Sequence, residues 1–269
     1  MSRLSKNQIN ALRYYVGEPD VYPGLPHDPK AYNTLNALFF PGIESEMARA
    51  KEGRFLNSGF FQCPKALLRF FYDMVEAMRI GGRNEPEKTV YRVDRESDAM
   101  NMIARRQTIS FTSTSKTGFL KEYTDKDRLV LLEFHLSKNI PQADMEKLLP
   151  VYKKPGESEI LLPPWLYITS YKRDLTNQEL SIRDRNGNPP VRAYMIYAER
   201  ICHFAATAHP LKRLLNNGIY ESLMNGIDPE KEDVERYLAW KHAMMMCFWG
   251  VWEGERNRDG TYVRLSCPG

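Results

Sequence analysis

The sequence predicts an α+β fold, in which helices and strands are segregated along the chain. Apolar residues recur at helical spacing in the first third, alternate as in strands from residue 89 onward, and return to helical spacing beyond residue 199. The 269 residues have a hydrophobic fraction of 42% and a charged fraction of 27%, which are typical of a folded globular protein. We therefore expect one large domain, or one domain with a sizeable appendage.

Three helices are expected in the N-terminal part. The first is a short amphipathic run over Asn7–Tyr15, and the second is Ala31–Phe40, which follows a loop rich in proline, glycine and aspartate. The third begins at Pro64, because proline suits the first turn of a helix, and ends at Gly81 and Gly82.

The middle of the chain predicts a series of strands, rich in β-branched and aromatic residues or alternating in polarity. They are Thr89–Val93, Thr108–Ser115, Leu129–Leu136, Ser158–Tyr171 and Val191–Tyr197. A turn cluster of charged residues, asparagine, glycine and proline precedes the last strand.

Composition excludes several partners. The net charge of 38 − 34 = +4 is small and evenly mixed, so we expect no nucleic acid. The longest apolar run, Ala243–Trp252, is about half of the ~20 residues that a membrane span needs. The start of the chain lacks the apolar core of a signal peptide. The reducing cytosol is the expected compartment, although a protein injected by a dedicated secretion machine would look the same.

Common catalytic and metal motifs are missing from the sequence. It has no GxGxxG, no phosphate loop, no HExxH and no GxSxG. The five histidines form no ligand-spaced pair, and the four cysteines lie too far apart for a metal knuckle or a disulfide framework. We therefore expect no metal site.

Three elements carried by predicted strands remain as candidates. They are Arg92 in the first strand, the hydroxyl-rich segment Phe111–Ser115 in the second, and Glu157 and Glu159 at the start of a very apolar strand. Carboxylates at i and i+2 of a strand share one face, about 7 Å apart, and are costly beside apolar residues unless they are used. A second Glu-x-Glu at Glu44 precedes a helix-forming run, so spacing alone does not separate the two.

Taken in order, these elements resemble the arginine–serine–glutamate class of mono-ADP-ribosyltransferases, which includes bacterial toxins and effectors and the vertebrate ecto-transferases. The motifs are TVYR, FTSTS and PGESEILLPP, and the resemblance extends from about Asn7 to Tyr197. It implies a fold of two packed, mainly antiparallel sheets with N-terminal helices and a C-terminal helical extension. The expected domains are 1–198, the catalytic domain, and 199–269, the extension.

The resemblance also implies the roles of four residues, with NAD as the substrate. Arg92 would bind the NAD diphosphate, and Glu159 would stabilise the cationic ribose that forms when nicotinamide leaves. Ser113 would hold Glu159 in place, and Glu157 would orient and deprotonate the acceptor. A glutamate at the position of Glu157 accompanies arginine acceptors in this family, so the expected acceptor is an arginine of a target protein.

Two loops complete the expected site. Leu148–Gly156 matches the loop that reads the acceptor protein, and Tyr152 is its exposed aromatic residue. Gly118–Arg128 matches the loop that contacts the phosphates and nicotinamide, where Tyr123 with Lys126 fits best and Phe119 with Arg128 is the alternative.

The resemblance implies a NAD-dependent transferase that acts as a monomer on a host or target protein. The expected setting is a secreted or injected effector or toxin in the host cytosol, and otherwise the cytoplasm. The alternatives are a NAD glycohydrolase without a protein acceptor, a transferase with a non-arginine acceptor, and a non-catalytic binding module. The tryptophans and methionines beyond residue 199 indicate either a packed helical extension or a target-recognition surface.

Overall fold

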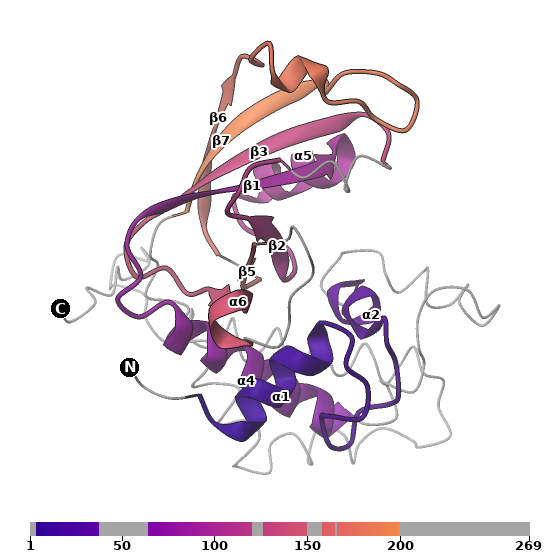
Figure 1. Cartoon of the computed structure of the whole chain (residues 1–269), viewed down its shortest axis with the longest axis vertical. Coiled ribbons are helices and arrows are strands. Elements are labelled where there is room, and N and C mark those ends of the chain that lie inside the picture. The colour runs from indigo at the N-terminus through magenta and orange to yellow at the C-terminus, as the bar shows by residue number, and fades with distance from the viewer. Residues whose placement is uncertain (1–3, 38–63, 120–125, 150–157, 165, 199–269) are drawn as a thin grey trace, which may run out of the picture. The chain divides into compact units, whose positions relative to one another are not determined.

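A computed structural model describes residues 4–37, 64–119, 126–149, 158–164 and 166–198. These residues fall into two compact units, one formed by 4–37 with 64–77 and the other by 78–198 (Figure 1). The predicted boundary after residue 198 lies at the edge of the described residues. The C-terminal extension, including its tryptophans and methionines, lies outside them.

The first unit is helical, as the sequence predicts. It contains α1 (Lys6–Tyr15), α2 (Ala31–Ala37) and most of α4 (Pro64–Gly81). Helix α1 begins at a capping box, in which Gln8 N–H donates to Ser5 Oγ and Ser5 N–H donates to Gln8 Oε1. The predicted end of the second helix, at Phe40, lies outside the described residues.

Aromatic rings form the core of this unit. The ring centroid of Phe70 lies 5.8 Å from that of Tyr14 and 5.4 Å from that of Tyr22, in edge-to-face arrangements that aromatic pairs favour. The hydroxyl of Tyr22 donates to Asp73 Oδ2 at 2.5 Å, so the buried carboxyl of Asp73 has a polar partner.

The second unit contains a seven-stranded sheet with the strand order β4-β5-β2-β1-β3-β7-β6. Its strands are β1 (Lys88–Arg95), β2 (Thr112–Ser115), β3 (Leu129–Leu136), β4 (Ala143–Asp144), β5 (Glu159–Leu162), β6 (Ile168–Arg173) and β7 (Arg192–Ala198). All neighbouring strands pair antiparallel except β3 and β7, which are parallel. The α+β class and the mainly antiparallel pairing are therefore confirmed.

The sheet is continuous through β1, whereas the resemblance implied two sheets. Strand β1 pairs with β3 along its whole length but with β2 only where Tyr91 faces Ser115. The group β4-β5-β2 and the group β1-β3-β7-β6 are thus joined at one narrow seam. Arg92, the residue after Tyr91, lies at this seam.

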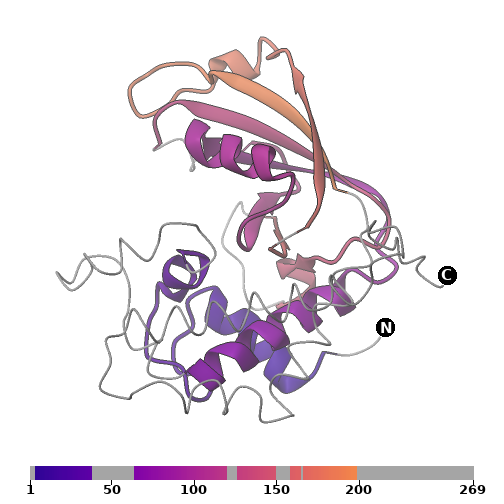
Figure 2. The ribbon, with the colours of Figure 1, turned by 180° about the vertical axis from the view of Figure 1, so that it is seen from behind.

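Three helical elements accompany the sheet. Helix α5 (Glu96–Arg105) follows β1 directly and lies beside β1 and β3 in both views (Figures 1 and 2). Helix α6 (Met145–Leu148) follows β4, and the short 3-10 helix η4 (Glu179–Ser181) lies between β6 and β7. Neither these helical elements nor strand β4 was expected from the sequence.

The predicted strand Ser158–Tyr171 is wrong as a single element. It divides into β5 and β6 because Pro163 and Pro164 have no N–H to donate to a ladder. The predicted strand Thr108–Ser115 is likewise shorter, since β2 begins at Thr112. The hydroxyl of Thr108 instead donates to the Pro163 carbonyl at 2.7 Å and accepts from Leu166 N–H at 2.9 Å.

Candidate active site

The candidate site lies within the second unit, where β1, β2 and β5 are consecutive in the sheet. Arg92 comes from β1, Ser113 from β2 and Glu159 from the first position of β5. Segments that are far apart in the sequence thus become neighbours through strand pairing. Three of the four predicted catalytic residues belong to this run of strands, and Glu157 lies outside the described residues.

Arg92 is held at two points. Its Nη1 donates to the carbonyl oxygen of Ser113 at 2.9 Å, and its Nε donates to Asp94 Oδ2 at 2.8 Å. The Nη2 atom of Arg92 also reaches Asp94 Oδ1 at 3.3 Å. These bonds fix the plane of the guanidinium group across the seam between β1 and β2. Its side chain is 27% exposed, so solvent reaches it.

Asp94 joins Arg92 to Lys126. The ammonium group of Lys126 lies 3.2 Å from Asp94 Oδ1 and also donates to the Val93 carbonyl at 3.1 Å. Two cations therefore share one carboxylate. Such a pair of fixed cations suits a phosphate-bearing ligand.

The pKa of Asp94 lies below its ordinary value. Burial alone would raise it, but the charges of Arg92 and Lys126 and the hydrogen bonds from them outweigh burial. Nearby Asp98 has a raised pKa because it is partly buried and because Asp94 carries a negative charge. The neighbouring cations thus favour the ionised form of Asp94, which is the form that pairs with both of them.

Asp94 was not among the site residues expected from the sequence. A signal was present, because Asp94 lies two positions after Arg92 in a strand, and residues at i and i+2 share a face. This spacing alone predicts that the carboxylate of Asp94 lies beside the guanidinium group of Arg92.

The register between β2 and β5 places Glu159 near the hydroxyl-rich segment. Ser115 is the direct partner of Glu159, and Ser113 is the direct partner of Leu161. Because Ser113, Ser115 and Glu159 have the same parity in this register, all three lie on one face of the sheet, together with Tyr91, the direct partner of Ser115. Ser113 is therefore diagonal to Glu159, at a separation of about 7–8 Å between Cα atoms. Arg92 is the next residue after Tyr91 and alternates with it, so it reaches β2 through the carbonyl oxygen of Ser113.

The hydroxyls of Thr114 and Ser115 brace the backbone. Thr114 Oγ1 donates to the Ile160 carbonyl of β5 at 2.7 Å. Ser115 Oγ accepts from Thr117 N–H at 3.1 Å and lies 3.1 Å from Thr117 Oγ1. Thr114 thus links β2 to β5, and Ser115 stabilises the turn that follows β2.

The second loop of the expected site is described only at its two ends. Phe119 packs edge-to-face on Tyr91, with 5.1 Å between ring centroids, and against the buried cluster that includes Val93 and Leu131. Lys126 is the basic residue that reaches Asp94, whereas Arg128 pairs with Glu96 through its Nε at 2.7 Å. Tyr123, in this loop, and Tyr152, in the acceptor loop, lie outside the described residues.

Among the described residues, no group of three or more histidine, cysteine, aspartate or glutamate side chains is arranged to hold a metal ion. None of their helices is long and apolar enough to cross a membrane.

No protein-family model matches the sequence, and no curated protein matches it. Solved structures do resemble it. The ATR domain of Salmonella SpvB is 17% identical, with 73% of this chain and 100% of that chain covered and a TM-score of 0.43. The ADP-ribosylating toxin BECa of C. perfringens, solved with NADH, is 14% identical, with 72% and 43% covered and a TM-score of 0.43.

A third similar structure is the ADP-ribosyltransferase Vis from Vibrio splendidus in complex with agmatine. It is 16% identical, with 74% of this chain and 77% of that chain covered and a TM-score of 0.39.

Proposed function

We propose that the chain transfers ADP-ribose from NAD to an arginine side chain of a target protein and releases nicotinamide. One observation carries the proposal: strand pairing gathers Arg92, the Ser-Thr-Ser segment and Glu159 from β1, β2 and β5 into adjacent strands. The sequence resemblance rests on the same three elements. Their adjacency in the second unit, and the hydrogen bond that Arg92 Nη1 donates to the Ser113 carbonyl, support a common site.

The reaction needs one bond to break and one to form. The bond between C1′ of the ribose and the nicotinamide nitrogen breaks, and nicotinamide leaves with the bonding electrons. The ribose then has the character of an oxocarbenium cation, which a carboxylate stabilises electrostatically. Glu159 supplies that carboxylate and binds a ribose hydroxyl.

The cations of the site bind the rest of NAD. Arg92 and Lys126, both held by Asp94, face the diphosphate, and Ser113 helps to position Glu159. An aromatic ring at Tyr123 or Phe119 stacks on nicotinamide. In this proposal NAD is a substrate that is consumed.

The acceptor side of the reaction depends on residues before β5. A guanidine nitrogen of the target attacks C1′, and Glu157 orients it and takes the proton that it loses. Tyr152 contacts the acceptor protein. We propose that the protein works as a secreted effector or toxin, because modification of a host protein takes effect inside the host cell.

The proposal is tested by measuring nicotinamide release from NAD with and without host lysate, together with transfer of labelled ADP-ribose. Transfer to a protein supports it, and mass spectrometry of the modified residue identifies the acceptor. Nicotinamide release without transfer to any protein would instead indicate a NAD glycohydrolase. Failure of NAD to bind at millimolar concentration would indicate a non-catalytic module.

The variant Glu157→Gln separates the two half-reactions. Transfer to arginine, or to agmatine as its small analogue, should fall by about 10²-fold, which is the usual contribution of a general base. Nicotinamide release with water as acceptor should stay within a few-fold of the parent. Undiminished arginine transfer by Glu157→Gln would show that the assigned acceptor role is wrong.

A further inference from the structure

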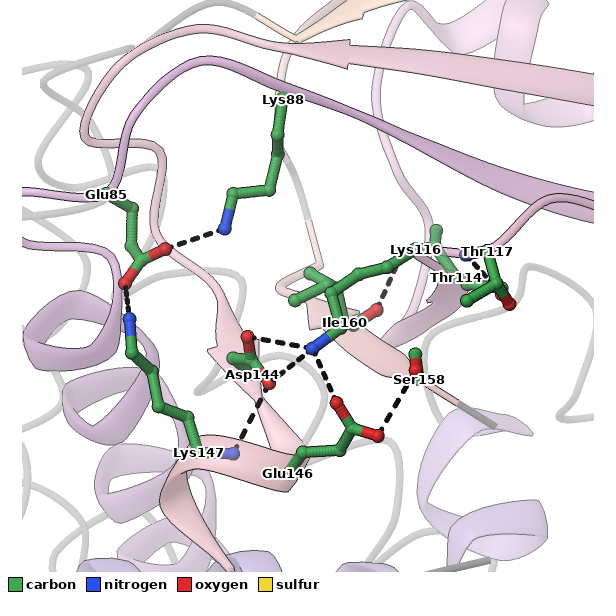
Figure 3. A network of polar contacts seen from close by, with 11 residues as sticks. Glu85, Lys88, Thr114, Lys116, Thr117, Asp144, Glu146, Lys147, Ser158 and Ile160 are labelled. Atoms are coloured by element: carbon green, nitrogen blue, oxygen red, sulfur yellow. Dashed lines mark hydrogen bonds and ion pairs between the residues drawn. The ribbon is translucent and has the colours of Figure 1, made fainter. Parts of the chain in front are cut away.

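Three polar residues meet at the point where β5 begins, and we call Lys116, Glu146 and Ser158 the β5 clamp (Figure 3). Lys116 directly follows β2, Glu146 belongs to α6, and Ser158 directly precedes β5. They come from three different segments of the second unit. None of them has a role in the function proposed above.

The carboxylate of Glu146 bridges the other two residues. Its Oε2 accepts from Lys116 Nζ at 2.7 Å, and its Oε1 accepts from Ser158 Oγ at 3.1 Å. The backbone N–H of Lys116 closes the ring by donating to the Ser158 carbonyl at 2.9 Å. Each member of the clamp therefore contacts both of the others.

A fourth residue anchors the clamp to the sheet. Both carboxylate oxygens of Asp144 lie 3.1 Å from Lys116 Nζ, and Asp144 also caps α6 by accepting from Lys147 N–H. Asp144 is the last residue of β4, which pairs with β5. The ammonium group of Lys116 is thus held by two carboxylates that belong to one short turn.

The exposure of the clamp argues against a purely stabilising role. The side chain of Glu146 is 43% exposed and that of Lys116 is 30% exposed. Ion pairs that solvent reaches to this extent add little to folding stability, because water screens them and two flexible side chains must be ordered. The geometry nevertheless fixes a backbone position, since one carboxylate engages two partners from different segments.

The position that is fixed lies next to the candidate catalytic carboxylate. Ser158 is bonded to Glu159, and successive side chains of an extended chain point in opposite directions. Holding the Ser158 hydroxyl on Glu146 and its carbonyl on Lys116 therefore sets the rotation of the chain at the start of β5. That rotation decides where the Glu159 side chain points.

We propose that Lys116, Glu146 and Ser158 are positioning residues that aim Glu159 at the ribose of NAD. This inference rests on the function proposed above. The clamp does not touch NAD; it acts through the backbone at residues 158 and 159. Because small displacements of a reacting group lower turnover strongly, loss of the clamp slows the chemical step and leaves NAD binding intact.

The test compares four variants with the parent protein, using nicotinamide release from NAD as the assay. Ser158→Ala removes the hydroxyl that Glu146 holds, and Ser158→Thr keeps it. Glu146→Gln removes the charge that Lys116 holds. Lys147→Gln is the matched control, because it removes a charge from the neighbouring position of α6, where Lys147 pairs with Glu85 outside the clamp.

We expect kcat to fall about tenfold in Ser158→Ala and in Glu146→Gln, with KM for NAD within twofold of the parent. Ser158→Thr should restore kcat to within twofold, and Lys147→Gln should keep the parental kcat, since Glu85 retains its ion pair with Lys88. Hydrogen exchange of the peptide that covers residues 158–162 should be faster in Ser158→Ala than in Ser158→Thr.

Two results would overturn the inference in distinguishable ways. A parent protein that releases no nicotinamide contradicts the proposed function, and the positioning role falls with it. An active parent whose Ser158→Ala and Glu146→Gln variants keep parental kcat contradicts the clamp alone. The clamp is also contradicted if kcat falls equally in Lys147→Gln, because the loss would then come from general destabilisation of α6.

Discussion

The Nε atom of Arg92 lies 2.8 Å from Oδ2 of Asp94, so the candidate diphosphate-binding arginine is fixed by a carboxylate two residues away on the same strand. The second oxygen of Asp94 accepts from Lys126, which comes from the segment before β3. One buried carboxylate thus sets the positions of both cations. The strength of this arrangement and its effect on NAD binding can be measured separately.

Replacing Asp94 by asparagine should weaken both folding and NAD binding. Removing one member of a buried ion pair costs about 3–5 kcal/mol, because the remaining charges lose their compensation. We expect a loss of that order in the free energy of unfolding, measured with denaturant, and an increase of about tenfold in KM for NAD as Arg92 and Lys126 lose their common anchor.

The matched control for this change is Asp127→Asn. Asp127 is 43% exposed and lies 3.8 Å from Arg95, so its replacement should change the free energy of unfolding by less than about 0.5 kcal/mol. Equal effects of the two substitutions would contradict the role given to Asp94.

The carboxyl groups of Asp94 and Asp73 should titrate on opposite sides of the ordinary value of 3.8. Burial would raise the pKa of Asp94, but the opposing charges of Arg92 and Lys126 lower it. Burial raises the pKa of Asp73, and the hydrogen bond from Tyr22 only partly offsets this effect. Carboxyl carbon resonances followed by NMR over an acidic pH range would report both values. A titration midpoint of Asp94 above that of Asp73 would contradict these two directions.

These shifts have opposite consequences for stability. Asp94, whose pKa is depressed on folding, contributes stability that is present above the unfolded value and is lost as the pH falls through the folded value. Asp73, whose pKa is raised, holds its proton more tightly when folded, so its contribution decreases as the pH rises from about 3.8 through the folded value. The Asp94→Asn variant should therefore lose less stability than the parent when the pH falls below about 4.

Thr108 should stabilise the fold by holding the segment between β5 and β6. It is fully buried, and its hydroxyl bonds both the Pro163 carbonyl and Leu166 N–H. Thr108→Val keeps the volume but leaves two buried backbone groups without this partner, so the free energy of unfolding should fall by about 2–3 kcal/mol.

Thr169→Val serves as the comparison for Thr108→Val. Thr169 lies half-buried on β6, where a β-branched residue fits well, and the change there should stay within about 0.5 kcal/mol. An equal loss in the free energy of unfolding for both variants, measured with denaturant, would contradict the importance given to the Thr108 contacts.

Strong local patterns predicted several elements with accurate bounds. Helix α4 begins at Pro64 and ends at Gly81, and β3 occupies Leu129–Leu136, as their apolar spacing indicates. Helix α5 was missed because it begins at Glu96 directly after a strand, and Arg95 at its N-cap forms no side-chain cap. Because no capping motif marks the start of this helix, the sequence gives no signal for a helix over these ten residues.

The site could be predicted only in part, because its geometry depends on pairing between distant segments. The resemblance selected Arg92, Ser113 and Glu159, and the register added that Ser115 is the direct partner of Glu159. Periodicity within one strand does not reveal which strand lies beside it or which residue faces which. The spacing between Arg92 and Asp94 is visible in the sequence, but the contact of Asp94 with Lys126 and that of the clamp residue Glu146 with Ser158 depend on segments from elsewhere in the chain.

The central claim is that Glu159 stabilises the cationic ribose as nicotinamide leaves. The most direct test measures nicotinamide release by the parent, by Glu159→Gln and by Glu87→Gln, in which an exposed carboxylate just before β1 is removed. We predict that Glu159→Gln is about 10²–10³-fold slower with a Kd for NAD within twofold of the parent, as expected when one charge-stabilising group is lost, while Glu87→Gln is unchanged. A folded Glu159→Gln variant that releases nicotinamide at the parental rate would contradict this account.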